Sequence, residues 1–156
     1  MALFKAYDVR GTVPDELNPE VAYGIGRAIA TFIGADCLAV GRDARAHSPE
    51  LTEALVRGIN DEGVDVYDLG LVATPMLYYA VGELGAGGGV MVTASHNPAE
   101  YNGFKVCRES AIPIGEDSGL REIESLCEAR SAEPVNQNRG KVEERDIREG
   151  YVDHAL

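Results

Sequence analysis

Short apolar segments alternate with helical segments along the N-terminal part of the chain. The apolar runs cover residues 37–41, 64–70 and 89–93, and helical segments at 48–61 and 74–84 separate them. Both helical segments begin with a polar residue followed by proline, Ser48-Pro49 and Thr74-Pro75, a pattern typical of an N-cap and a first helical turn. Strands that alternate with helices in this way predict a parallel sheet with helices on both faces.

The remaining segments predict elements that complete such a sheet. Predicted in order are a helix over 18–34 capped by Asn18, a turn at Asn102-Gly103, an edge strand over 104–107 of open direction, a helix over 116–129, a polar loop over 130–144 and a helix beginning near 146. We therefore expect an α/β fold with three layers, α/β/α, and a mixed, mostly parallel sheet of about four strands.

The charge of the chain limits the partners that we expect, and its cysteine content indicates a cellular location. Acidic residues outnumber basic ones by 26 to 14, for a net charge of −12, which argues against nucleic acid or an anionic membrane surface as a partner. No stretch approaches the roughly 20 apolar residues of a membrane span. The three cysteines, Cys37, Cys107 and Cys127, form no CxxC pair, which favours a reducing, cytoplasmic location over a disulfide framework or a zinc site.

Polar segments follow each predicted strand. In a parallel sheet the carboxyl ends of the strands share one edge, where ligands gather. We therefore expect residues 41–45, 73–75 and 93–98 to meet there. Within the first segment, Asp43 lies between Arg42 and Arg45, which predicts an ion pair that holds this loop, in either a structural or a functional role.

Ser95 is the candidate nucleophile in the last of these segments, "TASHNP". Taken alone, the Ser-His-Asn sequence favours a loop in which Ser95 and Asn97 bond their own backbone. A Ser/His hydrolase is disfavoured because no G-x-S-x-G elbow is present and His96 is an immediate neighbour, although His47 is available as a base.

Two cations, Arg10 and Lys105, favour a phosphate group on Ser95 over a hydrolase reaction. Arg10, placed in a turn before the first helix, and Lys105, opposite Phe104 on its strand, each read alone as surface cations. Together they could pair with the nearly two negative charges of a phosphoserine.

The segments "AYDVRG", "VGRDAR…SP", "ATP" and "TASHNPAEYNGFK" resemble, in order and spacing, the first domain of the α-D-phosphohexomutase family. The similarity is greatest to the phosphomannomutase/phosphoglucomutase branch and extends from residue 4 to about 150. It implies the first-domain fold of phosphoglucomutase, with residues 1–145 forming the domain and 146–156 beginning a helix that leads into a second domain.

The resemblance also implies a function. It identifies Ser95 as a phosphoserine that interconverts hexose 1-phosphate and hexose 6-phosphate through a hexose 1,6-bisphosphate. It implies Mg²⁺ bound through the Ser95 phosphate, with the aspartate ligands in another domain. The implied site residues are Ser95, His96, Lys105 and Arg10 in catalysis, with Tyr7, Arg10, Asn97 and Lys105 in binding phosphate or substrate.

The expected partners are hexose phosphates and the remaining domains of the same polypeptide. Alone, this chain is expected to lack mutase turnover, because the other domains would supply the metal ligands and the sugar-binding groups. The alternative is a non-catalytic α/β domain that binds a phosphorylated ligand or a partner protein at the same edge.

Overall fold

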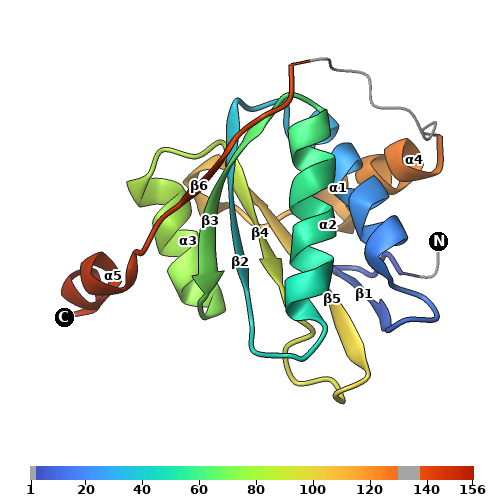
Figure 1. Ribbon diagram of the computed structural model, residues 1–156, viewed down its shortest axis with the longest axis horizontal. Coiled ribbons are helices and arrows are strands. Elements are labelled where there is room, and N and C mark those ends of the chain that lie inside the picture. Colours follow the sequence, from blue (N-terminus) through green and yellow to red (C-terminus); the bar gives the residue numbers. More distant parts are fainter. Residues whose placement is uncertain (1–2, 130–137) are drawn as a thin grey trace.

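A computed structural model describes residues 3–129 and 138–156 of the chain and shows one six-stranded sheet flanked by helices (Figure 1). The strands are β1 (Val9–Thr12), β2 (Cys37–Arg42), β3 (Asp65–Leu71), β4 (Gly88–Val92), β5 (Tyr101–Arg108) and β6 (Val142–Glu144). The helices are α1 (Pro19–Ile33), α2 (Ser48–Asp61), α3 (Thr74–Glu83), α4 (Arg121–Ala129) and α5 (Arg148–Ala155). A 3₁₀ turn covers Glu109–Ala111 and a π-helical turn covers Glu116–Leu120.

The sheet is mixed and mostly parallel, as expected. Its strand order is β1-β5-β4-β2-β3-β6, in which β4, β2, β3 and β6 run parallel and β5 runs antiparallel to both β4 and β1. The expected number of about four strands was too low. The two additional strands, β1 and β6, are short edge strands of four and three residues, too short to carry a clear alternation of apolar and polar side chains.

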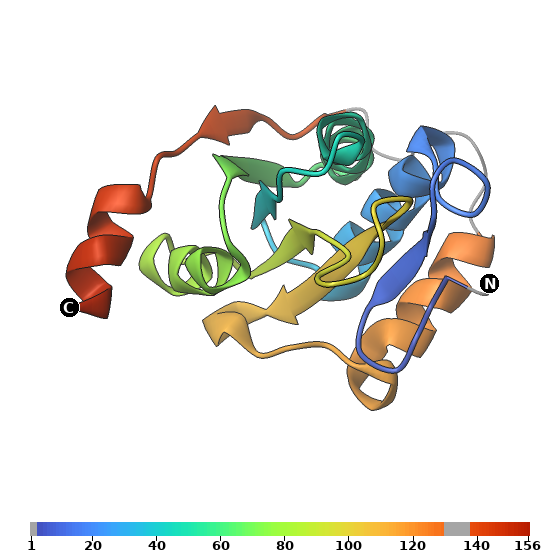
Figure 2. The same ribbon diagram turned by 90° about the horizontal axis from the view of Figure 1, so that it is seen from below.

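Helices on both faces make the three layers (Figure 2). Helices α1 and α2 cover one face, with α4 beside α1, and α3 covers the other. Alternate residues of the strands divide between the two resulting cores. The side chains that point towards α1 and α2 include Leu38, Val40, Val90, Val92 and Phe104. Those that point towards α3 include Ala39, Leu69, Met91 and Cys107.

Three local predictions were wrong around the strand β5. It lies between β1 and β4 and is an interior strand, whereas an edge strand was expected. Asn102 and Gly103 lie within it, paired with Gly11 and Arg10 of β1, and form no turn. Arg10 correspondingly lies on β1, where a turn was expected. An Asn-Gly pair favours a turn only locally, and pairing on both sides of β5 overrides that preference.

The starts of α1, α2 and α3 agree with the sequence to within one residue, whereas α4 begins at Arg121, after the π-helical turn, and not at residue 116. Asn18 caps α1 and accepts a hydrogen bond from Val21 N at 3.0 Å, as predicted. The predicted caps Ser48 and Thr74 are instead the first residues of α2 and α3, after His47 and Ala73. The Ser48 hydroxyl donates to Asp43 Oδ1 at 2.6 Å, so it stabilises the segment before α2 and does not cap the helix.

The C-terminal segment contains more structure than the sequence indicated. Strand β6 lies in the predicted loop 130–144, of which residues 130–137 lie outside the described residues. Helix α5 packs on α3, where the rings of Tyr79 and Tyr151 lie 5.8 Å apart. The domain boundary at residue 145 stays a prediction. In the two stretches that the structure describes, no helix has the length and apolar character needed to cross a membrane.

Glycines allow α1 and α2 to cross closely. A Cβ atom on Gly58 would overlap the carbonyl oxygen of Tyr23, and one on Gly26 would overlap that of Leu55. Because both obstacles are backbone atoms of the neighbouring helix, we expect Gly58→Ala to lower the free energy of unfolding by about 2–3 kcal/mol, despite the better helix propensity of alanine.

Urea denaturation followed by circular dichroism measures this loss, with Gly24→Ala on α1 as the matched control. A Cβ on Gly24 meets only Cys127 Sγ, at 3.7 Å. The control should therefore gain up to about 1 kcal/mol from helix propensity. Equal stability of the two alanine variants would contradict the close crossing.

Candidate functional site

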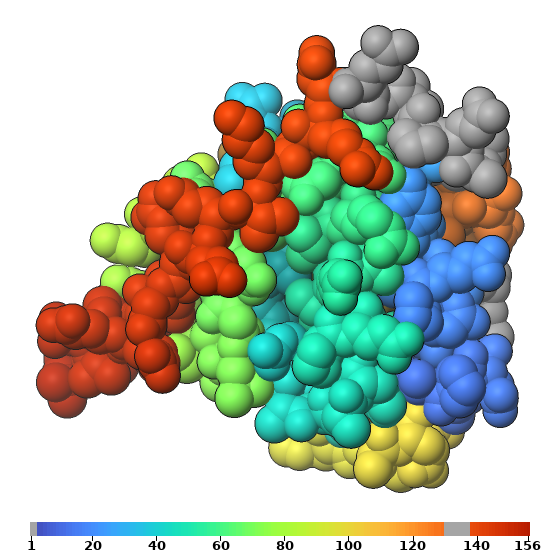
Figure 3. Space-filling model, viewed as in Figure 1, coloured from blue at the N-terminus to red at the C-terminus, as the bar shows by residue number. Residues whose placement is uncertain are grey.

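The carboxyl ends of the parallel strands bring the predicted polar segments to one edge of the sheet. Backbone hydrogen bonds join neighbouring strands where they end, from Asp43 N to Val92 O and from Val72 N to Arg42 O, both at 3.0 Å. The serine loop, residues 94–100, projects from this edge at the bottom of Figure 1. In the space-filling view its yellow atoms lie against the teal segment that precedes α2 (Figure 3).

Ser95 occupies a strained backbone conformation in this loop. Its φ of 54° lies in the left-handed region, which costs a non-glycine residue about 1–2 kcal/mol. Its N–H donates to Thr93 Oγ1 at 3.0 Å. The Ser95 side chain is exposed, and within the described residues its hydroxyl has no hydrogen-bond partner. The serine is thus presented to solvent on a defined backbone and does not cap the turn.

Arg45, in the segment between β2 and α2, binds the backbone of the serine loop. Its guanidinium donates four hydrogen bonds to carbonyl oxygens: from Nη1 to Pro98 (2.7 Å) and Tyr101 (3.0 Å), and from Nη2 to Asn97 (2.7 Å) and Ser95 (3.0 Å). Only arginine offers this many donors in a rigid planar fork. The side chain is 15% exposed, and its bonds to Tyr101 and Asn97 are partly buried.

Asp43 forms the predicted ion pair, and its partner is Arg45. Oδ2 of the carboxylate lies 3.3 Å from Arg45 Nε, and Oδ1 accepts from Ser48 Oγ at 2.6 Å. Burial acts to raise the pKa of Asp43, but hydrogen bonds from Ser48, Thr93 and the backbone of Arg45 outweigh it and leave the pKa below its usual value. Asp43 is therefore ionised at neutral pH and balances the arginine charge.

His47 adds a further contact to the loop and is engaged at both ring nitrogens. Nε2 lies 3.0 Å from Ala99 O and Nδ1 lies 2.9 Å from Asn102 Nδ2. Since the amide is a donor, Nδ1 accepts and Nε2 donates. A histidine with both nitrogens occupied by other groups is poorly suited to deprotonate Ser95, which further disfavours a hydrolase.

Arg10 and Lys105 lie on the same face of the strands β1 and β5. Val9 and Phe104 are register partners in the core, so the next residue of each strand projects to the opposite side. Both cations approach Asp8: its Oδ1 lies 3.9 Å from Arg10 Nε and its Oδ2 lies 3.8 Å from Lys105 Nζ. The structure therefore brings the two predicted cations together around a shared carboxylate.

The other predicted site residues, Asn97, His96 and Tyr7, lie in different surroundings. Arg10 Nη1 donates to Asn97 Oδ1 at 3.4 Å, which links the cation pair to the serine loop. Asn97 also donates from Nδ2 to Ala94 O at 2.8 Å, so its amide holds the loop. The exposed ring of His96 forms no hydrogen bond within the described part of the chain. Tyr7, 83% exposed, lines a hollow with residues 113 and 115–118.

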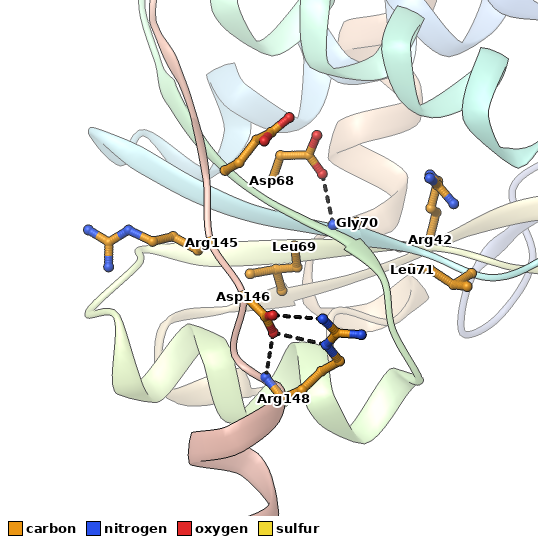
Figure 4. A pocket seen from close by; sticks show the side chains of 9 residues that line it. Arg42, Asp68, Leu69, Gly70, Leu71, Arg145, Asp146 and Arg148 are labelled. Atoms are coloured by element: carbon orange, nitrogen blue, oxygen red, sulfur yellow. Dashed lines mark hydrogen bonds and ion pairs between the residues drawn. The ribbon is translucent and has the colours of Figure 1, made fainter.

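A second concave region lies at the β3 and β6 side of the sheet (Figure 4). It has a volume of about 590 Å³, and two of its charged residues pair with each other, Arg148 Nη2 lying 2.8 Å from Asp146 Oδ2. Among residues 3–129 and 138–156, no three His, Cys, Asp or Glu side chains are grouped so that they could hold a metal ion. The serine loop is therefore the candidate site.

Sequence reasoning missed the residues that support Ser95. Asp8 stands in the segment "YDVRG" beside Arg10 but was given no role, and Asn102 was assigned to a turn. Asn102 is fully buried and donates to Ser48 Oγ at 2.9 Å. In a period of two, Asn102 falls on the same face as Phe104 and Val106, so a polar residue there interrupts the apolar-polar alternation and hid its place in the strand.

The fold and these contacts define an α/β/α domain that presents an exposed serine next to a pair of cations at the carboxyl edge of its parallel strands. Residues 1–133 match the family described as phosphoglucomutase/phosphomannomutase, alpha/beta/alpha domain I. This match covers most of the chain. The chain belongs to that family and forms its N-terminal domain.

Relatives and a solved structure agree with this assignment. The chain is 45% identical to a phosphomannomutase of Escherichia coli K12 over 157 residues, all of this chain and 34% of the relative. A Klebsiella pneumoniae phosphomannomutase is 46% identical, with 98% of each chain covered. The crystal structure of a phosphoglucomutase/phosphomannomutase family protein from Burkholderia thailandensis superposes with a TM-score of 0.85 at 35% identity, covering 97% of this chain and 34% of that one. The chain thus spans about a third of most of these relatives.

Proposed function

We propose that this chain is the phosphoserine-bearing domain of a phosphohexomutase and that Ser95 carries the transferred phosphoryl group. The single observation that supports this most strongly is the presentation of Ser95: an exposed hydroxyl on a strained loop whose backbone is fixed by Arg45. Phosphoryl transfer depends mainly on positioning and on electrostatic stabilisation, and a fixed loop beside cations supplies both.

In the proposed reaction a hexose monophosphate hydroxyl attacks the phosphorus on Ser95. The bond between phosphorus and Ser95 Oγ breaks as the bond to the sugar oxygen forms, which leaves free serine and a hexose 1,6-bisphosphate. After the sugar turns over, Ser95 Oγ attacks the other phosphate and releases the isomeric monophosphate. The proton of the attacking hydroxyl passes to a nearby base, and the serine oxygen takes one up when it leaves.

Arg10 and Lys105 are proposed to stabilise the charge of the phosphoryl group. Their positions around Asp8, with Arg10 reaching the serine loop at Asn97, support this role. Lys105 is the candidate for the proton transfer, and His96 and Tyr7 are candidates for contacting the sugar phosphate because both are exposed. Asn97 is proposed to hold the loop while the phosphoryl group moves.

Magnesium would neutralise charge on the phosphoryl group, and in this domain the Ser95 phosphate is the proposed ligand. The carboxylates required for a complete site are not gathered in the part of the chain that the structure describes. The remaining ligands are proposed to lie elsewhere in the enzyme. The hexose phosphates and the further domains of the enzyme remain the proposed partners, and the cytoplasm its proposed location.

Intact mass of the complete enzyme, before and after phosphatase treatment, tests the phosphoserine directly. The enzyme is first incubated with hexose 1,6-bisphosphate, after which we expect one phosphate that peptide mapping assigns to Ser95. The Ser95→Ala variant treated identically is the control and should take up none. A phosphate found on another residue, or none after incubation, would exclude the proposed role of Ser95.

A further inference from the structure

Side chains from one segment bind most carbonyl groups of the serine loop. Arg45 and His47, both between β2 and α2, together contact the carbonyl oxygens of Ser95, Asn97, Pro98, Ala99 and Tyr101. Such a concentration of contacts exceeds what is needed to anchor a loop at one point. It fixes the orientation of successive peptide planes as well as the path of the chain.

The fixed carbonyls determine where the neighbouring N–H groups point. A trans peptide is planar, with its C=O and the following N–H on opposite sides. Since the Ser95 carbonyl points at Arg45, the N–H of His96 points away from Arg45. Within the described residues this N–H has no hydrogen-bond partner, whereas the N–H of Asn97 bonds to Ala94 O at 3.0 Å.

We propose that Arg45 is a positioning residue that orients the His96 N–H as a hydrogen-bond donor to a phosphoryl group on Ser95. The role rests on the proposed function, because it supplies a backbone donor next to the phosphate that Ser95 would carry. A backbone N–H fixed before the reaction stabilises an anion without reorganisation. Asp43, Ser48 and Asn102 act behind Arg45 by holding its guanidinium in place.

The test is hydrogen exchange on this 156-residue chain, with Arg45→Lys as the variant. Lysine keeps the charge but cannot span four carbonyls. In the unphosphorylated chain the amides of Asn97 and Tyr101, bonded within the loop, should exchange at least about tenfold faster in the variant. Arg121→Lys is the matched control, because Arg121 is 69% exposed and pairs only with Glu116 among the interactions described.

The second arm uses the chain with phosphoserine installed at position 95 during biosynthesis. In the parent chain and in Arg121→Lys we expect phosphorylation to slow exchange of the His96 amide by about tenfold more than in Arg45→Lys. The negative charge of the phosphate slows exchange in the parent chain and in both variants. The difference in slowing between Arg45→Lys and the other two proteins therefore reports on the hydrogen bond. Asp43→Asn, which leaves the fork but loosens its Nε contact, should give a smaller change in the same direction and replaces Arg45→Lys if that variant fails to fold.

Two results would overturn the inference. Unchanged exchange at Asn97 and Tyr101 would show that Arg45 does not hold the loop. Faster loop exchange with equal protection of the phosphorylated His96 amide would show that Arg45 holds the loop without orienting that donor. Neither arm requires turnover, so a failure of the proposed function, seen as phosphate on another residue of the complete enzyme, is distinguished from a failure of this inference.

Discussion

Replacing Ser95 with alanine in the complete enzyme is expected to lower mutase turnover by at least about a thousandfold, because the residue that would carry the phosphoryl group is lost. The substitution removes one exposed oxygen that bonds to no other described residue, so the fold should be unaffected. The left-handed backbone at this position is equally strained with alanine. Conversion of hexose 1-phosphate to hexose 6-phosphate in a coupled assay measures the loss.

Ser110→Ala is a matched control for this variant. Ser110 is also exposed and also has a positive φ, 60°, but it lies in the 3₁₀ turn that follows β5, outside the candidate site. Its replacement should leave turnover within about twofold of the parent enzyme. If Ser95→Ala retained a tenth or more of the activity, another residue would have to accept the phosphoryl group.

Arg27→Met is expected to lower the free energy of unfolding by about 3–5 kcal/mol, the largest stability change predicted for the domain. The Arg27 side chain is 2% exposed on α1, and its Nε lies 2.9 Å from Glu62 Oε2 at the end of α2. Methionine fills a similar volume but removes the guanidinium from the Glu62 carboxylate, which is 10% exposed and keeps the hydrogen bond from Thr31 Oγ1 at 3.1 Å. An uncompensated buried charge is more costly than the loss of the pair as a whole.

Urea denaturation of the single variant and of the double variant Arg27→Met/Glu62→Gln separates the cost of leaving Glu62 without Arg27 from the cost of losing the whole pair. The double variant should regain at least about 1 kcal/mol of the stability lost, because the amide needs no counter-ion. The single variant is chosen to preserve side-chain volume so that no large cavity forms. A loss below about 1 kcal/mol in the single variant would mean that the pair is effectively solvated.

Periodicity and helix-start signals were sufficient for the strands β2, β3 and β4 and for the helices α2 and α3. These elements were identified because their patterns are local: apolar runs of strand length, two of them followed by polar residues and proline. The edge strands β1 and β6 escaped because each has three or four residues and derives its conformation from pairing with a neighbour. The same pairing turned Asn102-Gly103, a turn dipeptide by local preference, into part of an interior strand.

For the site, the sequence and its family resemblance indicated the residues proposed to carry chemistry but not those that hold them. Ser95, Arg10 and Lys105 were recognised from their types and from the segments around them. The structure adds that Arg10 and Lys105 share Asp8, and that His47, considered as a base, instead holds the loop. A supporting role depends on which atoms meet, and residue type alone leaves that open.

The serine and its two cations were singled out by the resemblance to the phosphohexomutase family. The sequence by itself determined the alternation of strands and helices and the gathering of polar loops at the carboxyl edge of the sheet. These follow from patterns within about ten residues and from the geometry of parallel sheets. Only the tertiary structure decided that Arg45 binds the serine loop, because those bonds join residues 50 to 56 positions apart. Contacts of that range exist only once β2 and β4 pair side by side, which brings the segment after each strand into reach of the other.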